Sequence, residues 1–133
     1  MKHKLLVLGT IFLMTGCSNQ PASIDSQVDE LYAQMSMEER VAQLRSGFMD
    51  DLFDEAGRLD TLKCRELIPN GTGHFSQYAS QKPVDANPLR DRVAAVQDWL
   101  MHHTPNGIPA LFHEEVLSGV NTSGATIYPQ QIG

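Results

Sequence analysis

Apolar positions first recur with a helical period in residues 28–47. Four of them follow the spacing i, i+3, i+4, i+7, which places them on one face of a helix. These positions are Val28, Leu31, Tyr32 and Met35. The pattern predicts an amphipathic helix that buries this face.

A second helix is predicted directly afterwards. Ser36 followed by Glu39 matches a capping box, in which each residue satisfies a backbone N–H of the other. We expect Val41 and Leu44 to form the buried face, and Gly47 to end the helix.

The next segment has a weaker pattern. Residues 48–66 carry helical spacing interrupted by Gly57, which predicts a helix-rich excursion. Leu67 and Ile68 are then expected to begin a buried strand. Residues 70–73 follow, and their glycines are typical of a loop or of a strand that tolerates glycine.

The clearest helix follows. Asn87 is a favourable N-cap, and Pro88 suits the first helical position. The apolar stripe of this helix comprises Leu89, Val93, Val96 and Leu100. His102 and His103 fall in its last turn, where a cation suits the helix dipole.

A strand is predicted after this helix. Pro105 and Gly107 end the helix, and residues 108–112 (IPALF) form a nearly continuous apolar run, as buried parallel strands do. This order of elements indicates an α/β unit, since a helix is followed by a tight loop, a strand and a charged loop.

The sequence His113-Glu114-Glu115 follows the predicted strand and has three chemical interpretations. A helical zinc motif needs a second histidine four residues away, and none is present. His102 and His103 are adjacent, so they diverge by about 100° on a helix. We therefore predict no metal site and no cofactor.

An acid–base pair is the second interpretation. Neighbouring residues at a strand end point to opposite faces, so Glu114 and Glu115 cannot easily flank one glycosidic bond. The third interpretation is one wall of a sugar pocket, because α/β barrels place their sites at the carboxyl ends of strands. A solvated loop without function stays open as an alternative.

Residues 1–16 have the pattern of an export signal. Lys2 and Lys4 precede an apolar stretch, Leu5 to Met14, which is too short to span a bilayer. Met14 to Cys17 (MTGC) resembles a bacterial lipobox, with Cys17 as the lipidated residue. The chain therefore divides into a signal peptide (1–16), a tether (17–27) and a domain (28–133). Lipid on Cys17 implies an exported protein anchored in the periplasm or at the outer membrane.

Composition narrows the class of partner. The 133 residues are 41% hydrophobic and carry a net charge of −6, which suits one globular domain and argues against nucleic-acid binding. With Cys17 lipidated, Cys64 has no intramolecular disulfide partner and is expected to be a semi-buried thiol.

Residues 107–133 (GIPALFHEEVLSGVNTSGATIYPQQIG) resemble the N-terminal barrel domain of glycoside hydrolase family 3. The pattern of that family is a GIP strand, an acidic residue, a variable pair followed by His-Gly, and a Thr-x-x-Pro-Gln stretch. Residues 28–44 are similar to the opening helix of that family, and residues 70–75 to its glycine-rich first strand. The resemblance implies the α/β class, as the start of a TIM (β/α)8 barrel that this chain does not complete.

The resemblance also implies a function. It makes Glu115 the acidic residue that binds hydroxyls of the substrate sugar, whereas Ser118 stands where the motif has histidine. Gly119, Pro129 and Gln130 match positions that we expect to be structural. The family's nucleophile and general acid lie beyond the matched region, so no residue here is a catalytic candidate.

We therefore expect the N-terminal portion of a secreted, membrane-tethered retaining β-glycosidase. Its substrates would be oligosaccharides or other β-glycosides with a terminal β-D-glucosyl or β-D-xylosyl residue, and the chain alone is expected to be inactive. The alternative is a small surface lipoprotein that binds glycans or a partner without catalysis. A membrane-tethered pair of interaction helices is a third hypothesis, based only on the amphipathic segments.

Overall fold

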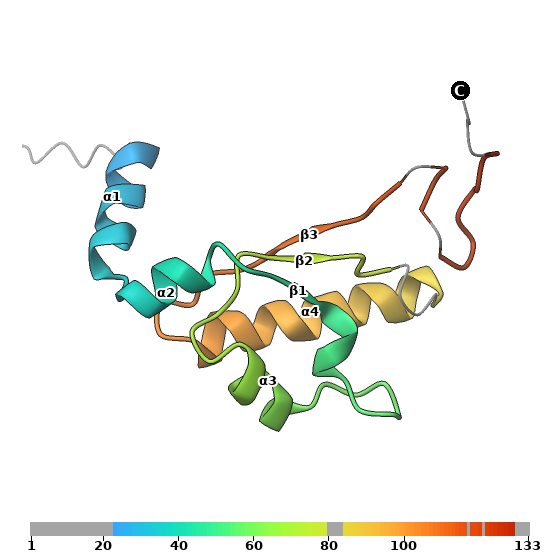
Figure 1. Ribbon diagram of the computed structural model, residues 1–133, viewed down its shortest axis with the longest axis horizontal. Coiled ribbons are helices and arrows are strands. Elements are labelled where there is room, and N and C mark those ends of the chain that lie inside the picture. Colours follow the sequence, from blue (N-terminus) through green and yellow to red (C-terminus); the bar gives the residue numbers. More distant parts are fainter. Residues whose placement is uncertain (1–22, 80–83, 117, 121, 130–133) are drawn as a thin grey trace, which may run out of the picture.

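Three parallel strands and four α-helices form the part of the chain that the computed structural model describes, residues 23–79, 84–116, 118–120 and 122–129 (Figure 1). The order of elements is α1 (Ile24–Gln34), α2 (Met37–Ala42), β1 (Ser46–Phe48), the 3-10 helix η1 (Met49–Leu52), α3 (Thr61–Leu67), β2 (His74–Ser76), α4 (Ala86–His103) and β3 (Leu111–His113). No helix within these residues is long and apolar enough to cross a bilayer.

The strand order in the sheet follows the chain order. β1 pairs with β2 and β2 pairs with β3, both in parallel. The register aligns Gly47, Phe75 and Phe112 across the sheet. Each parallel connection contains helical structure, as parallel pairing requires.

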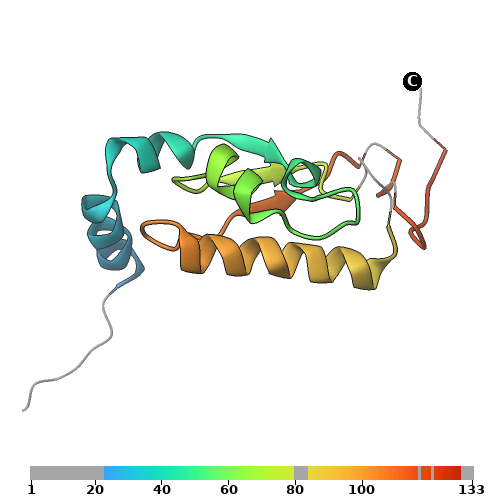
Figure 2. The ribbon, with the colours of Figure 1, turned by 90° about the horizontal axis from the view of Figure 1, so that it is seen from below.

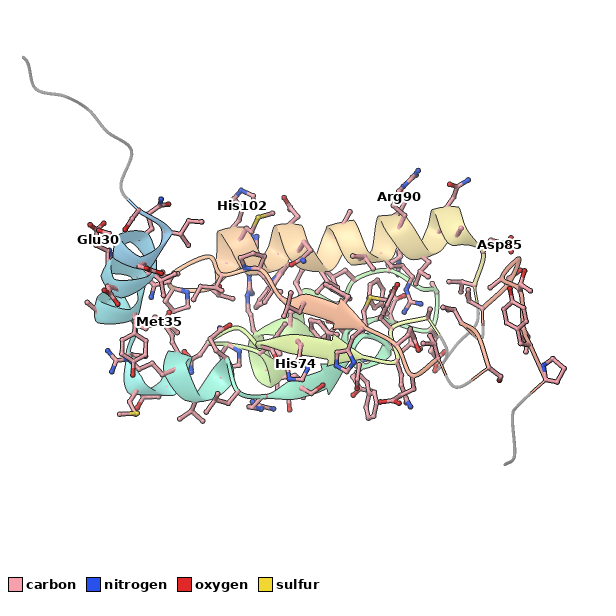
Figure 3. All side chains as sticks on the ribbon, turned by 90° about the horizontal axis from the view of Figure 1, so that it is seen from above. Glu30, Met35, His74, Asp85, Arg90 and His102 are labelled. Carbon is pink, nitrogen blue, oxygen red and sulfur yellow. The ribbon has the colours of Figure 1, made fainter. Side chains whose placement is uncertain are left out.

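The two faces of the sheet have different surroundings. α3 and α4 both lie on the face that carries Phe75, whose ring stacks on Phe112 with centroids 5.2 Å apart (Figure 2). Figure 3 looks onto the opposite face, where no described helix covers the strands and where His74 lies. We call this the open face of the sheet.

One buried cluster lies between the sheet and the helices. It consists of Met49, Leu52, Phe53, Cys64, Ile68, Phe75, Ala79, Leu89, Val96, Trp99, Leu100 and Ala110. The predicted stripe of α4 is confirmed, since Leu89, Val96 and Leu100 are buried and Val93 packs against the cluster. The side chain of Gln97 also bonds to both backbone groups of Ala110, at 2.8 and 3.0 Å, and so joins α4 to the start of β3.

The first helix differs from its prediction in two ways. Ser23 caps α1, which begins at Ile24, so residues 24–27 of the predicted tether are helical. The predicted apolar face is not buried, and Val28 and Tyr32 are more than half exposed. The described cover over this face is small, since the guanidinium of Arg40 in α2 lies over the Tyr32 ring, 3.9 Å from its centroid. Helical periodicity alone therefore did not determine burial.

The second helix begins as predicted and buries a different face. The capping box of Ser36 and Glu39 is present. Val41 and Leu44 are exposed, whereas Glu39 and Ala42 are buried, so the predicted buried face is wrong. Hydrogen bonds to the Glu39 carboxylate make its burial possible. The predicted stop at Gly47 is also wrong, because this glycine lies in β1.

Residues 48–66 contain η1 and most of α3, so the predicted helical content is confirmed. The strand predicted at Leu67 is wrong. Asp60 caps α3 through the N–H groups of Leu62 and Lys63, and the helix continues to Leu67. Ile68 then packs into the core as the residue that ends the helix, and strand structure begins only at His74.

The last two elements, α4 and β3, begin at other residues than predicted. α4 begins at Ala86 with Asp85 as its N-cap residue, so Asn87 and Pro88 lie inside the first turn. β3 spans Leu111–His113 rather than 108–112, and Leu111 is 75% exposed. A continuous apolar run predicts a strand that is buried on both faces. In the structure the open face leaves Leu111 and His113 of β3 uncovered.

Candidate functional site

The carboxyl ends of the three strands meet at one edge of the sheet because all three strands are parallel. β1 ends at Phe48, β2 at Ser76 and β3 at His113. In open parallel sheets, ligands bind beyond this edge, where the loops that follow the strands converge. The residues predicted from sequence as a site, 113–115, lie at this edge.

Glu114 joins two of these loops. The backbone N–H of Ala79 donates a hydrogen bond to its Oε1, which connects the segment after β2 with the segment after β3. Gln77 adds a second connection, since its N–H donates to the carbonyl of His113 at 3.0 Å. Gln77 has a φ of 51°, a left-handed conformation that costs free energy for a residue with a side chain. Glu114 thus connects the segments that follow β2 and β3.

Glu115, the predicted sugar ligand, is exposed at the same edge. It lies just beyond Glu114, the residue that holds the segment against the neighbouring loop. Among the described residues, none forms a hydrogen bond or ion pair with the Glu115 side chain. Both carboxylate oxygens can therefore accept hydrogen bonds from an incoming ligand.

His113 has a partner that sequence analysis did not identify. Its Nε2 lies 2.9 Å from Nδ1 of His74, and the two ring centroids are 5.1 Å apart. The two residues are 39 positions apart in the chain and meet through the pairing of β2 with β3. Only the strand register brings them together, so no local sequence signal could have identified His74.

Asp50, the first of two acidic residues that follow β1, stabilises the fold. Asp50 forms an ion pair with Arg92 of α4, and the two side chains are only 10% and 13% exposed. The Arg92 guanidinium also lies over the ring of Phe53, 4.1 Å from its centroid. Asp50 is therefore neutralised inside the protein rather than presented to a ligand.

A separate groove of about 560 Å³ lies between the turn at residues 53–59 and the first half of α4. Its lining is mainly apolar, and it includes none of the predicted site residues. In its wall, the backbone N–H of Arg58 donates to Asp54 at 2.8 Å, and this bond keeps the pKa of Asp54 below its usual value.

Three further predictions concern a metal site, the burial of Cys64 and the export signal. No cluster of three or more His, Cys, Asp or Glu able to hold a metal ion occurs within the described part of the chain. Cys64 is fully buried on α3, so it is more buried than expected. The predicted lipidation site Cys17, the predicted signal peptide and Gln130 lie outside the described residues.

Comparison with known proteins gives no assignment: no protein-family model matches the chain, and no curated protein matches it significantly. The resemblance to glycoside hydrolase family 3 therefore stays a prediction from the motifs quoted above.

Proposed function

We propose that this chain forms the N-terminal part of a β-glycosidase barrel related to glycoside hydrolase family 3, exported and tethered to the membrane by lipid on Cys17. The order of the sheet supports this proposal. Consecutive parallel strands with α3 and α4 on one face are what a singly wound (β/α)8 barrel requires of its first strands. In such a barrel the open face would point inward.

The observation that carries the proposed function is the position of Glu115. Its exposed carboxylate follows β3 at the carboxyl edge of the sheet, on a segment that Glu114 holds in place. A carboxylate can accept hydrogen bonds from two adjacent sugar hydroxyls, and charge-assisted bonds of this kind are the stronger ones. The ligand class is a terminal β-D-glucosyl or β-D-xylosyl residue.

Binding and catalysis are separate in this proposal. Glu115 binds sugar and takes no part in bond cleavage. A retaining glycosidase needs two facing carboxyl groups about 5 to 5.5 Å apart, and the proposal assigns neither of them to this chain. The chain by itself should therefore bind the sugar and hydrolyse none.

A surface lipoprotein that binds glycans without catalysis is the second candidate. The continuous buried cluster favours it, because helices α3 and α4 and the sheet already share one core. The same carboxylate, Glu115, would be the ligand in this case. The two candidates differ in whether hydrolysis occurs when further chain is present.

An NMR titration of the ¹⁵N-labelled chain with methyl β-D-glucoside and methyl β-D-xyloside tests the site. We expect the shifted amide signals to cluster in the loops after β2 and β3, at residues 76–79 and 113–116. We also expect no release of nitrophenol from nitrophenyl β-glycosides. Shifts confined to the groove beside Arg58, or none with either sugar, would contradict the proposed site.

A further inference from the structure

The two histidines on the open face form an arrangement that the proposed function does not use. His74 Nδ1 and His113 Nε2 lie 2.9 Å apart in a hydrogen bond in which one ring donates and the other accepts, and the ring planes are inclined by 35°. We propose that this pair is a two-histidine binding site for a divalent copper ion. The inference is independent of the sugar site, because it uses neither Glu115 nor a glycan.

The sheet fixes the spacing of the two side chains. In the parallel register, His74 aligns with Leu111, and His113 aligns with Ser76. The two histidines therefore occupy diagonal positions on adjacent strands and project from the same face. Because each side chain starts from a paired strand, the two imidazoles converge with little loss of backbone freedom on binding.

The two ring nitrogens are close enough to bind one ion together. Metal–imidazole bonds are about 2.0–2.1 Å long. Two such bonds at a right angle place the nitrogens about 2.9 Å apart, whereas a tetrahedral angle places them about 3.4 Å apart. The 2.9 Å of the hydrogen bond is close to both spacings, so a small rotation of the rings lets the two nitrogens bind one ion. Among the divalent ions that imidazole binds, Cu²⁺ has the highest affinity, and copper is therefore the ion that we assign to this pair.

The surroundings leave room for further ligands. His113 is exposed and His74 is half-buried, so water can fill the remaining positions. No third His, Cys, Asp or Glu of the described residues completes a cluster there. The site is thus open and exchangeable, and it needs both imidazoles in the neutral form because a protonated ring cannot ligate. The ring that donates in the hydrogen bond must also carry its proton on its other nitrogen, so that both facing nitrogens present a lone pair to the ion.

The test is a Cu²⁺ titration of the full chain, followed by calorimetry and by electron paramagnetic resonance. Every protein in this test, the parent included, carries His3→Gln, because an amino terminus with histidine at the third position can itself bind Cu²⁺. We expect one bound ion with a tetragonal spectrum and two imidazole nitrogens. His74→Gln and His113→Gln should each weaken binding at least about ten-fold.

The matched control is the double variant His102→Gln/His103→Gln, which removes two exposed histidines at the end of α4 and should bind within about two-fold of the parent. A measurement without substitution guards against misfolding of the histidine variants. Unfolding the parent in urea separates the two histidines and should abolish the two-nitrogen signal. The proposal is wrong if His74→Gln and His113→Gln bind as tightly as the parent, or if the signal survives unfolding.

Discussion

The side-chain amide of Asn106 donates a hydrogen bond of 2.6 Å to the buried carboxylate of Glu39, across 67 positions of the chain. The other carboxylate oxygen accepts the backbone N–H of Ser36 at 2.9 Å. One charged group thus caps α2 and also holds the turn that leads from α4 to β3. A buried carboxylate is tolerated here because donors from two segments satisfy it.

These bonds predict a pH dependence of stability. The backbone N–H of Ser36, followed by the amide of Asn106, lowers the pKa of Glu39 from its usual value of 4.5. A lowered pKa in the folded state contributes stability that is fully present above 4.5 and is lost as the pH falls through the folded value. Urea unfolding should therefore show that Asn106→Ala costs about 1.5 kcal/mol at pH 7 and markedly less at pH 3. An equal cost at both pH values would contradict this account.

Gly73 is predicted to resist substitution. A Cβ at this position would overlap the backbone carbonyl of Gln43, which cannot move without shifting the chain that enters β1. Gly73→Ala should lower the free energy of unfolding by about 3 kcal/mol. Gly57→Ala is the control, because its Cβ would meet no atom within 4 Å and only its φ of 76° opposes alanine. That variant should lose about 1 kcal/mol, and a reversed order in thermal melts would count against the packing described here.

The ion pair of Asp50 and Arg92 should be a major contributor to stability. Both groups are largely buried, so removing either leaves an uncompensated charge. We expect Asp50→Ala and Arg92→Ala each to cost about 3 kcal/mol, and the double variant to cost less than the sum. Arg90→Ala removes an exposed pair with Asp91 and should cost less than about 0.5 kcal/mol. Additive losses for Asp50 and Arg92 would show that the two residues do not interact.

Cys64 should be unreactive in the folded protein. Burial, followed by the negative charge of Asp60, raises the pKa of its thiol from 9.0 to about 11. The thiolate is the reacting form, so a thiol reagent at pH 8 should modify folded Cys17→Ser protein at least about a hundred-fold more slowly than the urea-unfolded protein. Similar rates in the two states would mean that Cys64 is accessible.

Helices were predicted best where residues only a few positions apart determine them. The capping box of Ser36 and Glu39 and the apolar stripe of α4 both depend on residues a few positions apart, and the structure contains both. Burial was predicted less well, because it depends on which elements pack together. Val41 and Leu44 have the right spacing for a buried face, yet no described helix or strand covers them.

Long-range pairing explains what sequence analysis missed at the candidate site. The position of Glu114 after a strand could be predicted, but its contact with Ala79 depends on how two loops meet. His74 and His113 become neighbours only through the register of β2 and β3. The same holds for Asn106 and Glu39, whose contact joins segments that the local patterns treated separately.

The most direct test of the central claim is the affinity of the chain for methyl β-D-glucoside and methyl β-D-xyloside, compared with that of Glu115→Gln. Glu66→Gln, which changes an exposed glutamate on α3, is the matched control. If Glu115 holds the sugar, the dissociation constant should rise about ten-fold in Glu115→Gln and stay within two-fold in Glu66→Gln. Unchanged affinity in Glu115→Gln would remove this residue from the site and contradict the proposed function.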